Sequence, residues 1–182
     1  EKLPFHIPLA IGLLDAEGKD IPLAAGETTE LLELKEASQT FSFKDVPCKP
    51  VPSLLRGFSA PVKLHYDYSR QDLVFLMSHD SDGFNRWEAG QKLAVDVIQE
   101  LIRDYQAGRE MVLDPLLEGA FQKVLSDRQL DPAIAAKVLQ LPSEAYLSEL
   151  AEEIDVAAIH HVRKFVRATL AERLQGLFMD CY

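Results

Sequence analysis

The spacing of apolar residues changes once along this chain, near residue 82, and that change constrains the fold more than any other feature of the sequence. Before residue 82, apolar side chains alternate with polar ones in short runs, which is the period of a strand with one buried face. After it, they recur every three or four residues, which is the period of a helix with one apolar stripe. The sequence therefore predicts a β region, residues 1–82, followed by an α-helical region, residues 83–182.

The β region contains short apolar runs separated by turn-forming residues, a pattern typical of a small antiparallel sandwich. Gly18 can adopt the positive φ that a turn requires, and it predicts a hairpin between the first two runs. Prolines are concentrated between residues 47 and 61, where each would remove an N–H donor from a ladder, so we expect an ordered crossover loop there. The expected strands cover residues 5–14, 21–23, 32–34, 41–43, 62–68 and 73–77.

The α region starts with a long helical pattern. Asn85 and Glu88 have the spacing of a reciprocal helix cap, and Phe84 precedes them as an apolar staple. An apolar stripe extends from there to Tyr105, and Gly108 stands where a left-handed residue would end the helix. We therefore expect one long helix between these two signals.

Later helices are predicted from residues that cap helix N-termini. Asp114 and Asp131 each precede a proline, which is favoured at the first helical position, and Ser143 and Asp155 can cap two more helices. The five helices form an α-helical array, although no internal repeat is clear enough to predict a solenoid. The predicted fold class is multi-domain α+β: a small antiparallel Ig-like β-sandwich followed by the start of an α-helical array.

Charge and composition argue against two classes of partner. The 182 residues carry 29 acidic and 19 basic side chains, a net charge of −10, which repels phosphate backbones and anionic membrane surfaces. No apolar run approaches the roughly 20 residues needed to cross a bilayer. We therefore expect neither a nucleic acid nor a membrane as a partner. Cys48 and Cys181 lie far apart in unlike contexts, which predicts two free thiols and favours the reducing cytoplasm.

The histidines do not form a metal-binding pattern. The H-E-x-x-H motif is absent, and the adjacent His160 and His161 would point about 100° apart on a helix, too far to share an ion. We expect one of them to be packed and the other solvated. The three remaining histidines are scattered over the β region, where surface positions are expected: His6, His65 and His79.

Other catalytic and binding patterns are missing too. Residues 80–83, Asp-Ser-Asp-Gly, resemble the start of a calcium loop, but Phe84 follows the glycine and no glutamate stands at the twelfth position. A turn and a helix entry are expected there instead. No serine lies in a G-x-S-x-G elbow, and no glycine-rich phosphate loop is present. We predict no catalytic, cofactor-binding or metal-binding residue in this chain.

A basic cluster on the last helix leaves two interpretations open. Arg163, Lys164 and Arg167 could bind an anion, or they could form a solvated face paired with nearby carboxylates such as Glu152 and Glu153. Solvated charged faces are the commoner use of such a cluster, and the sequence favours that interpretation.

Three segments carry a family resemblance. They are FHIPLAIGLLD at 5–15, VPSLLRGFSAPVKL at 51–64 and FLMSHDSDGFNRWEAGQ at 75–91. In this order they resemble the bacterial aminopeptidase N family of zinc metallo-aminopeptidases (gluzincins), downstream of the catalytic domain. The resemblance spans essentially the whole chain and is looser in the helices after Gln91.

The resemblance implies a β-sandwich followed by a large helical domain that caps the active site. It implies a parent enzyme that removes N-terminal amino acids from peptides with one zinc ion, whose catalytic and zinc-binding motifs lie upstream and map onto no residue here. It would also place Arg56 in a segment that docks the sandwich against neighbouring domains. From the residues alone, Arg56 is a surface side chain stacked on Phe58, and the resemblance favours the docking role.

The leading hypothesis is a non-catalytic fragment, not an enzyme on its own, with the sandwich as spacer and the helices as the beginning of the lid. The first residue is Glu1, and an apolar helical pattern continues through 170–181 without a stop signal, which predicts a truncated piece. Its expected partners are the remainder of its parent chain and, through exposed apolar surface, a second copy; peptides are the parent's substrate and zinc the parent's cofactor. The alternative is a stand-alone adaptor that binds a protein partner.

Overall fold

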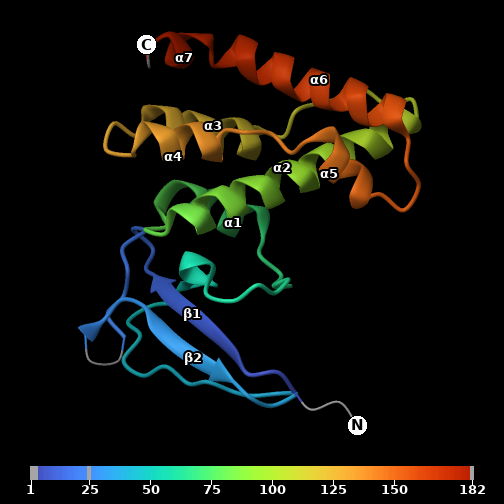
Figure 1. Cartoon of the computed structure of the whole chain (residues 1–182). Coiled ribbons are helices and arrows are strands. Elements are labelled where there is room, and N and C mark those ends of the chain that lie inside the picture. The colour runs from blue at the N-terminus through green and yellow to red at the C-terminus, as the bar shows by residue number, and fades with distance from the viewer. Residues whose placement is uncertain (1–3, 24–25, 181–182) are drawn as a thin grey trace. The chain divides into compact units, whose positions relative to one another are not determined.

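The chain forms two compact units, residues 1–86 and 87–182, in a computed structural model that describes residues 4–23 and 26–180 (Figure 1). Helix α2, Gly83–Gln106, starts in the first unit and continues in the second. The predicted boundary between residues 82 and 83 falls at the first residue of α2, and a division into domains at that point stays a prediction. Among the described residues, no helix combines the length and the apolar character that crossing a membrane requires.

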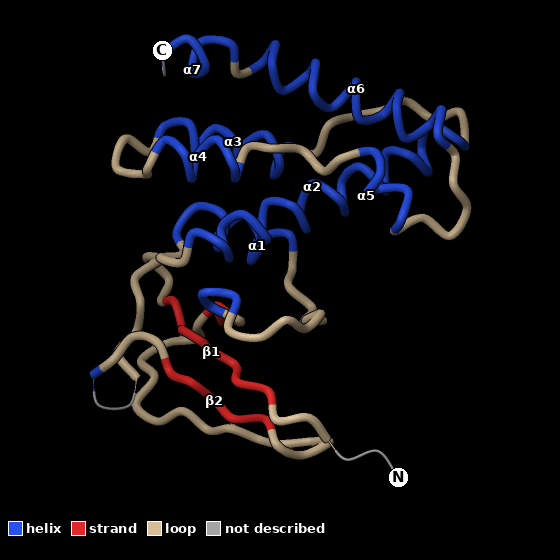
Figure 2. The backbone as a smooth tube through the Cα atoms, in the orientation of Figure 1, coloured by secondary structure: helices blue, strands red, loops and turns tan. Residues whose placement is uncertain are grey.

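A three-stranded antiparallel sheet in the order β2-β1-β3 lies in the first unit (Figure 2). Leu9 of the central strand pairs with Leu32 on one side, and Ile11 pairs with Leu54 on the other. Ile11 and Leu32 are buried, as is Leu13, so the predicted strands at the start of the chain and around residue 32 are confirmed. The strands are β1 (Ile7–Leu14), β2 (Glu30–Leu34) and β3 (Val51–Leu54).

The turn after β1 forms as predicted, but the hairpin is shorter. Gly18 has a φ of +81°, and the carboxylate of Asp15 accepts hydrogen bonds from two amides of the turn. The returning chain then makes a single isolated bridge, between Leu14 and Asp20. The predicted strand at 21–23 is therefore wrong, because the chain leaves the ladder after this bridge.

The prediction of a buried strand at 73–77 is also wrong, because these residues lie in helix α1, Arg70–His79. Ser69 and Asp72 form a reciprocal cap at its N-terminus. A run of five apolar residues suits a buried strand and a buried helix equally well, and the cap decides in favour of the helix. The residues that α1 buries have helical spacing: Leu73, Val74, Leu76 and Met77.

Two further predicted strands, at 41–43 and 62–68, are irregular chain. Their side chains alternate, but neither segment is hydrogen-bonded into the ladder of the sheet. Alternation in 62–68 produces a local contact instead, between the rings of Tyr66 and Tyr68, whose centroids are 4.4 Å apart. Conversely, the predicted crossover loop contains β3. Pro52 is accommodated there because β3 is an edge strand.

The second unit is helical, and the predicted N-caps at Asp114, Asp131, Ser143 and Asp155 are confirmed. Each of these side chains accepts a hydrogen bond from an amide of the following helix. A sixth helix, α7, follows the five that the sequence predicts for this part of the chain. The helices after α2 are α3 (Pro115–Ser126), α4 (Pro132–Val138), α5 (Glu144–Glu149), α6 (Val156–Arg173) and α7 (Gln175–Asp180).

Helix α2 has the predicted stripe and the predicted end but a different start. Gly108, with a φ of +67°, follows the helix as expected. The predicted cap at Asn85 is wrong: the helix begins at Gly83, because the Asp82 carboxylate accepts the hydrogen bond from the Asn85 amide. The buried stripe in the second unit comprises Leu93, Ala94, Val97, Ile98 and Leu101.

Helices α3, α5, α6 and α7 pack around the core of the second unit. Helix α6 contacts α5 and α7, and α7 contacts α3. An ion pair of 2.7 Å between Arg173 Nη1 and Glu118 Oε2 links α6 to α3 at the surface. The fully buried side chains Leu117 on α3 and Val162 on α6 belong to this core.

Candidate functional site

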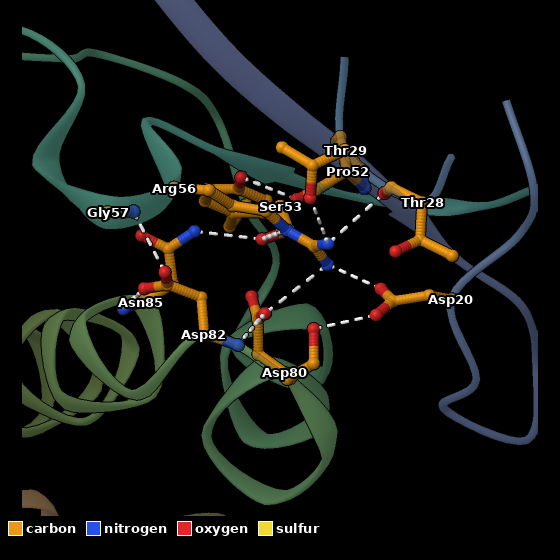
Figure 3. A network of polar contacts seen from close by, with 12 residues as sticks. Asp20, Thr28, Thr29, Pro52, Ser53, Arg56, Gly57, Asp80, Asp82 and Asn85 are labelled. Carbon is orange, nitrogen blue, oxygen red and sulfur yellow. Dashed lines mark hydrogen bonds and ion pairs between the residues drawn. The ribbon is translucent and has the colours of Figure 1, made fainter. Parts of the chain in front are cut away.

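Arg56 lies at the centre of a polar network inside the first unit (Figure 3). Its side chain is only 6% exposed. The residue opens the short 3-10 helix η2, Arg56–Phe58, which is separated from β3 by Leu55 alone. Leu55 and Gly57, on either side of it, have left-handed φ values of +58° and +61°. These two residues turn the chain sharply at the edge of the sheet, and the Arg56 side chain lies over β1.

Three of the five guanidinium N–H groups are held by hydroxyl and carbonyl oxygens. Arg56 Nε donates to Ser53 Oγ at 2.8 Å. Nη1 donates to the Thr28 carbonyl at 3.2 Å and to Thr29 Oγ1 at 3.1 Å. These bonds connect β3 with the segment just before β2.

The other terminal nitrogen faces two carboxylates. Arg56 Nη2 donates to Asp20 Oδ1 and, at 3.5 Å, to Asp80 Oδ1. The Ser81 hydroxyl donates to the second oxygen of Asp20 at 2.6 Å. Because a guanidinium carries five N–H donors and all five have acceptors here, Arg56 has no free donor for a ligand.

Gly12 leaves the space that Arg56 occupies over β1. A Cβ atom at this position would lie 2.1 Å from Arg56 Cζ and 2.3 Å from Nη1. Any larger residue would displace the guanidinium, so the network requires glycine at this point of the central strand.

Asp80 is the most buried charged residue of the network, at 2% exposed. Its Oδ1 accepts a hydrogen bond from the Asp82 amide at 2.9 Å, whereas its Oδ2 is buried without a hydrogen-bond partner among the described residues. Burial raises the pKa of the Asp80 carboxyl above its ordinary value of 3.8, against the opposing effects of the Asp82 amide, the Ser53 hydroxyl and the Arg56 guanidinium. Folding therefore disfavours the charged form of Asp80 relative to its protonated form.

Asp82 and Asn85 connect the network to the first turn of α2. Asp82 accepts hydrogen bonds from the Gly57 amide at 2.8 Å and from the Asn85 amide at 2.9 Å. The Asn85 side chain donates to Ser53 Oγ at 2.8 Å. The interpretation of residues 80–83 as a turn and a helix entry is confirmed, and their carboxylates bind N–H groups of the protein itself.

The prediction of a surface Arg56 stacked on Phe58 is wrong, because the guanidinium is buried and fully hydrogen-bonded. Phe58 is instead 52% exposed, and its ring centroid lies 5.3 Å from that of Phe84. The alternative, a docking role for this segment, stays a prediction. If the segment docks, the exposed ring of Phe58 rather than Arg56 is the group available for contact.

Sequence reasoning missed Asp20, Ser53 and Asn85 as partners of this network. Asp20 is 36 positions away from Arg56 and Asn85 is 32 positions away from Ser53, so no local spacing could have joined them. The only available signal was a charged residue directly after an apolar pair of leucines, which suggests a buried charge in need of partners.

The histidines lie apart from one another. His160 Nδ1 is 3.0 Å from Glu144 Oε1, and His161 stacks on Tyr105 with ring centroids 4.7 Å apart. Both side chains are exposed, so the prediction that one of them is packed is wrong. Across the described part of the chain, no three His, Cys, Asp or Glu side chains are grouped so that they could hold a metal ion. The three histidines predicted to be at the surface are exposed: His6, His65 and His79.

The basic cluster of α6 borders a hollow in the second unit. Arg163 is half-buried and donates from Nε to the Pro142 carbonyl at 2.7 Å, whereas Arg167 is exposed. The predicted carboxylate partners are wrong, since neither Glu152 nor Glu153 pairs with the cluster in the described residues.

Two family models match the chain. Residues 1–67 match a domain of unknown function, DUF3458, with an Ig-like fold, and residues 70–182 match a domain of unknown function, DUF3458_C, with ARM repeats. The predicted fold class, an Ig-like β-sandwich followed by a helical array, is confirmed. The ARM-repeat description adds a repeat that the sequence alone did not reveal.

Curated relatives named aminopeptidase N align with most or all of the chain. Identity is 44% over 100% of this chain with the protein of Escherichia coli (strain K12) and 35% over 100% with that of Haemophilus influenzae, each covered to 21% of its length. It is 41% over 92% of this chain with the protein of Caulobacter vibrioides, which is covered to 18%. The chain thus spans about a fifth of the length of these relatives, and the resemblance to bacterial aminopeptidase N is confirmed.

A solved structure has a similar fold. The crystal structure of Legionella pneumophila aminopeptidase A in complex with aspartic acid matches with a TM-score of 0.80 at 33% identity, over 96% of this chain and 20% of that one. The alternative of a stand-alone adaptor has no support in any of these comparisons.

Proposed function

Because this chain belongs to the DUF3458_C family of ARM-repeat domains, we propose that it is a non-catalytic part of a zinc-dependent aminopeptidase. The parent enzyme removes N-terminal residues from peptides. Its β-sandwich acts as a spacer, and its helices form the beginning of a lid over the active site.

One observation carries this proposal. The 44% identity to aminopeptidase N of Escherichia coli covers 100% of this chain but only 21% of that protein. A shared fold alone would not favour one function over another, because common folds serve many functions. Identity at this level over both the β region and the helical region favours the same role in the same architecture.

The chemistry of the polar network supports a structural role. All five donors of Arg56 bind acceptors of the first unit, and the Asp82 carboxylate binds backbone amides. The described residues also offer no three-ligand group that fits zinc. We therefore assign the zinc ion and the catalytic residues to the remainder of the parent chain.

The proposed mechanism of this part is steric. A helical lid restricts entry to peptides that can thread past it and excludes folded proteins. It also removes water from the active site, which strengthens the electrostatic interactions that act on the substrate there.

Exposed apolar side chains in the second unit are candidates for contact with another polypeptide. Val112, Ile154 and Val156 are 66%, 63% and 65% exposed. Another chain that covered these side chains would remove apolar surface from water. We propose that the remainder of the parent chain is the partner and that the isolated chain dimerises through such side chains. A cytoplasmic location, without nucleic-acid or membrane partners, completes the proposal.

The first test is the size of the native polypeptide, measured by immunoblot of source-cell extract with an antibody against the 182-residue chain. A band several times heavier than 20.4 kDa would support the proposal. A band at 20.4 kDa would overturn it, because no parent chain would then exist.

The second test separates the roles of the chain and its parent. With zinc added, the isolated chain should not hydrolyse leucine p-nitroanilide, whereas the full-length polypeptide should. Turnover that co-elutes with the isolated chain would contradict a non-catalytic role. For the lid, the full-length polypeptide should cleave a tripeptide much faster than the exposed N-terminus of a folded protein; equal rates would contradict a restricting role.

A further inference from the structure

The hollow beside α6 combines an apolar interior with two cationic side chains, all within the second unit. Its volume is about 180 Å³. None of the residues that line it is acidic. The apolar lining comes from α3, from the chain between α4 and α5, from α6 and from α7: Phe121, Leu139, Leu141, Leu170, Ala171 and Phe178.

The cations are Arg163 and Arg167, which also line the hollow. They stand four residues apart on α6, so their side chains lie on the same face of the helix. Arg163 is fixed by its 2.7 Å hydrogen bond from Nε to the Pro142 carbonyl, and this bond leaves its terminal nitrogens free of any described partner. Arg167 has no hydrogen bond or ion pair with any described residue, which leaves its whole guanidinium available.

Such a pair attracts an anion despite the overall charge of the chain. The net charge of −10 repels anions at a distance, but this repulsion is screened over about 10 Å in ordinary salt. At contact, the two arginines act in a half-enclosed apolar environment, where the attraction between charges is stronger than in open water. A carboxylate suits them best, because a guanidinium can bind both of its oxygens in a planar, bidentate geometry.

We propose that this hollow binds an organic carboxylate that carries a short apolar group. The carboxylate contacts Arg167 and the free nitrogens of Arg163, and the apolar group lies against Leu170 and Phe178. A volume of about 180 Å³ holds one side chain of the size of leucine, so the ligand is no larger than a single acylated residue or a short fatty acid. The inference depends only on these residues and holds whether or not the parent is an aminopeptidase.

The test is a titration of the full 182-residue chain with N-acetyl-L-leucine, followed by amide chemical shifts in two-dimensional NMR. We expect saturable shifts in α6 and α7 that weaken as salt is raised. N-acetyl-L-leucinamide, which lacks only the carboxylate, should bind at least about tenfold more weakly, since a charge-assisted contact is lost. Hexanoate distinguishes two sources of the carboxylate. If hexanoate binds as tightly as N-acetyl-L-leucine, any apolar carboxylate suffices. If it binds more weakly, the ligand is the C-terminal residue of a peptide.

Variants of α6 localise the site. Arg167→Gln should weaken binding about tenfold, and the exposed position of Arg167 keeps the fold intact. Arg173→Gln is the matched control, because Arg173 is on the same helix but pairs with Glu118 and does not line the hollow. Its affinity should equal that of the unchanged chain. The proposal is overturned if neither carboxylate binds saturably, if the amide binds as well as the acid, or if Arg167→Gln leaves the affinity unchanged.

Discussion

The first and second units are stabilised by different kinds of interaction. All the buried polar side chains of the described residues belong to the first unit: Ser53, Arg56, Asp80 and Asn85. The second unit buries apolar side chains along its helices and keeps its ion pairs, such as Arg173 with Glu118, near the surface. The first unit therefore combines an apolar core with a buried charged network, whereas the described core of the second unit is apolar.

The difference determines how each unit responds to damage. A buried network fails as a whole, because the loss of one member leaves its partners buried without hydrogen bonds. An apolar core loses stability in proportion to the cavity that each truncation leaves. Substitutions in either unit test this difference when the hydrogen exchange of amides in β1 and in α6 is measured separately.

Arg56→Ala should have the largest effect. It leaves the Asp20 and Asp80 carboxylates without their counter-ion in a buried setting, and removal of one partner of a buried pair costs about 3–5 kcal/mol. Urea unfolding and amide exchange in β1 measure the loss. The matched control is Lys35→Ala, which removes an exposed ion pair with Glu33 in the same unit and should cost no more than about 1 kcal/mol. Equal costs for the two variants would refute the central role of the network.

Leu117→Ala should destabilise the second unit by about 3 kcal/mol, because Leu117 is fully buried and the variant leaves a cavity. Amides of α6 should exchange faster, while those of β1 keep their protection. Leu150→Ala is the control, since Leu150 is 42% exposed and its truncation should cost well under 1 kcal/mol. Equal acceleration of β1 and α6 exchange by Leu117→Ala would mean that the two units unfold together.

The same difference explains what the sequence could predict. Helix caps are local, so Asp114 before a proline predicts a helix start from residues that are adjacent in the chain. The four caps predicted for the helices after α2 are confirmed for this reason. The predicted cap at Asn85 is wrong because the helix begins earlier, at Gly83, and the Asp82 carboxylate accepts the hydrogen bond of the Asn85 amide.

The β region resisted prediction because strands need partners from elsewhere in the chain. Alternating side chains at 41–43 and 62–68 satisfy the period of a strand, but no strand within residues 4–23 or 26–180 pairs with them. The Arg56 network has the same origin, since its partners come from the turn after β1, the segment before β2 and the C-cap residue of α1. Periodicity identifies a half-buried face; it does not identify the group that covers it.

Gly12→Ala should destabilise the first unit by about 2 kcal/mol, because the new methyl group would overlap the Arg56 guanidinium and force it out of position. Gly119→Ala, in α3, is the matched control, and it should increase stability rather than decrease it. A Cβ atom at position 119 would meet no other part of the described chain within 4 Å, and replacement of a helical glycine by alanine should stabilise the chain by about 0.5–1 kcal/mol. Thermal unfolding of the two variants measures both effects, and a neutral Gly12→Ala would contradict the close approach of Arg56 to β1.

Asp80→Asn should have an effect that depends on pH. Burial raises the pKa of Asp80, so its protonated form is favoured by folding. The stability that this group contributes is present below its ordinary pKa of 3.8 and is lost as pH rises through the raised value. Asparagine stays neutral throughout, so the variant should gain stability relative to the unchanged chain as pH increases. Urea midpoints measured from pH 3 to pH 7 follow this difference.

Asp155→Asn, in the second unit, should change stability with pH in the direction opposite to Asp80→Asn. The Ala158 amide and then the Gln106 side chain lower the pKa of Asp155, so its charged form is favoured by folding. Its contribution is present above the ordinary pKa of 3.8 and is lost as pH falls through the lowered value, and Asp155→Asn should therefore lose stability relative to the unchanged chain as pH rises. Opposite dependences of stability on pH for the two variants would follow from one fully buried carboxylate and another that is half-buried at a helix N-terminus. Parallel slopes would mean that Asp80 is stabilised by Arg56 more than it is destabilised by burial.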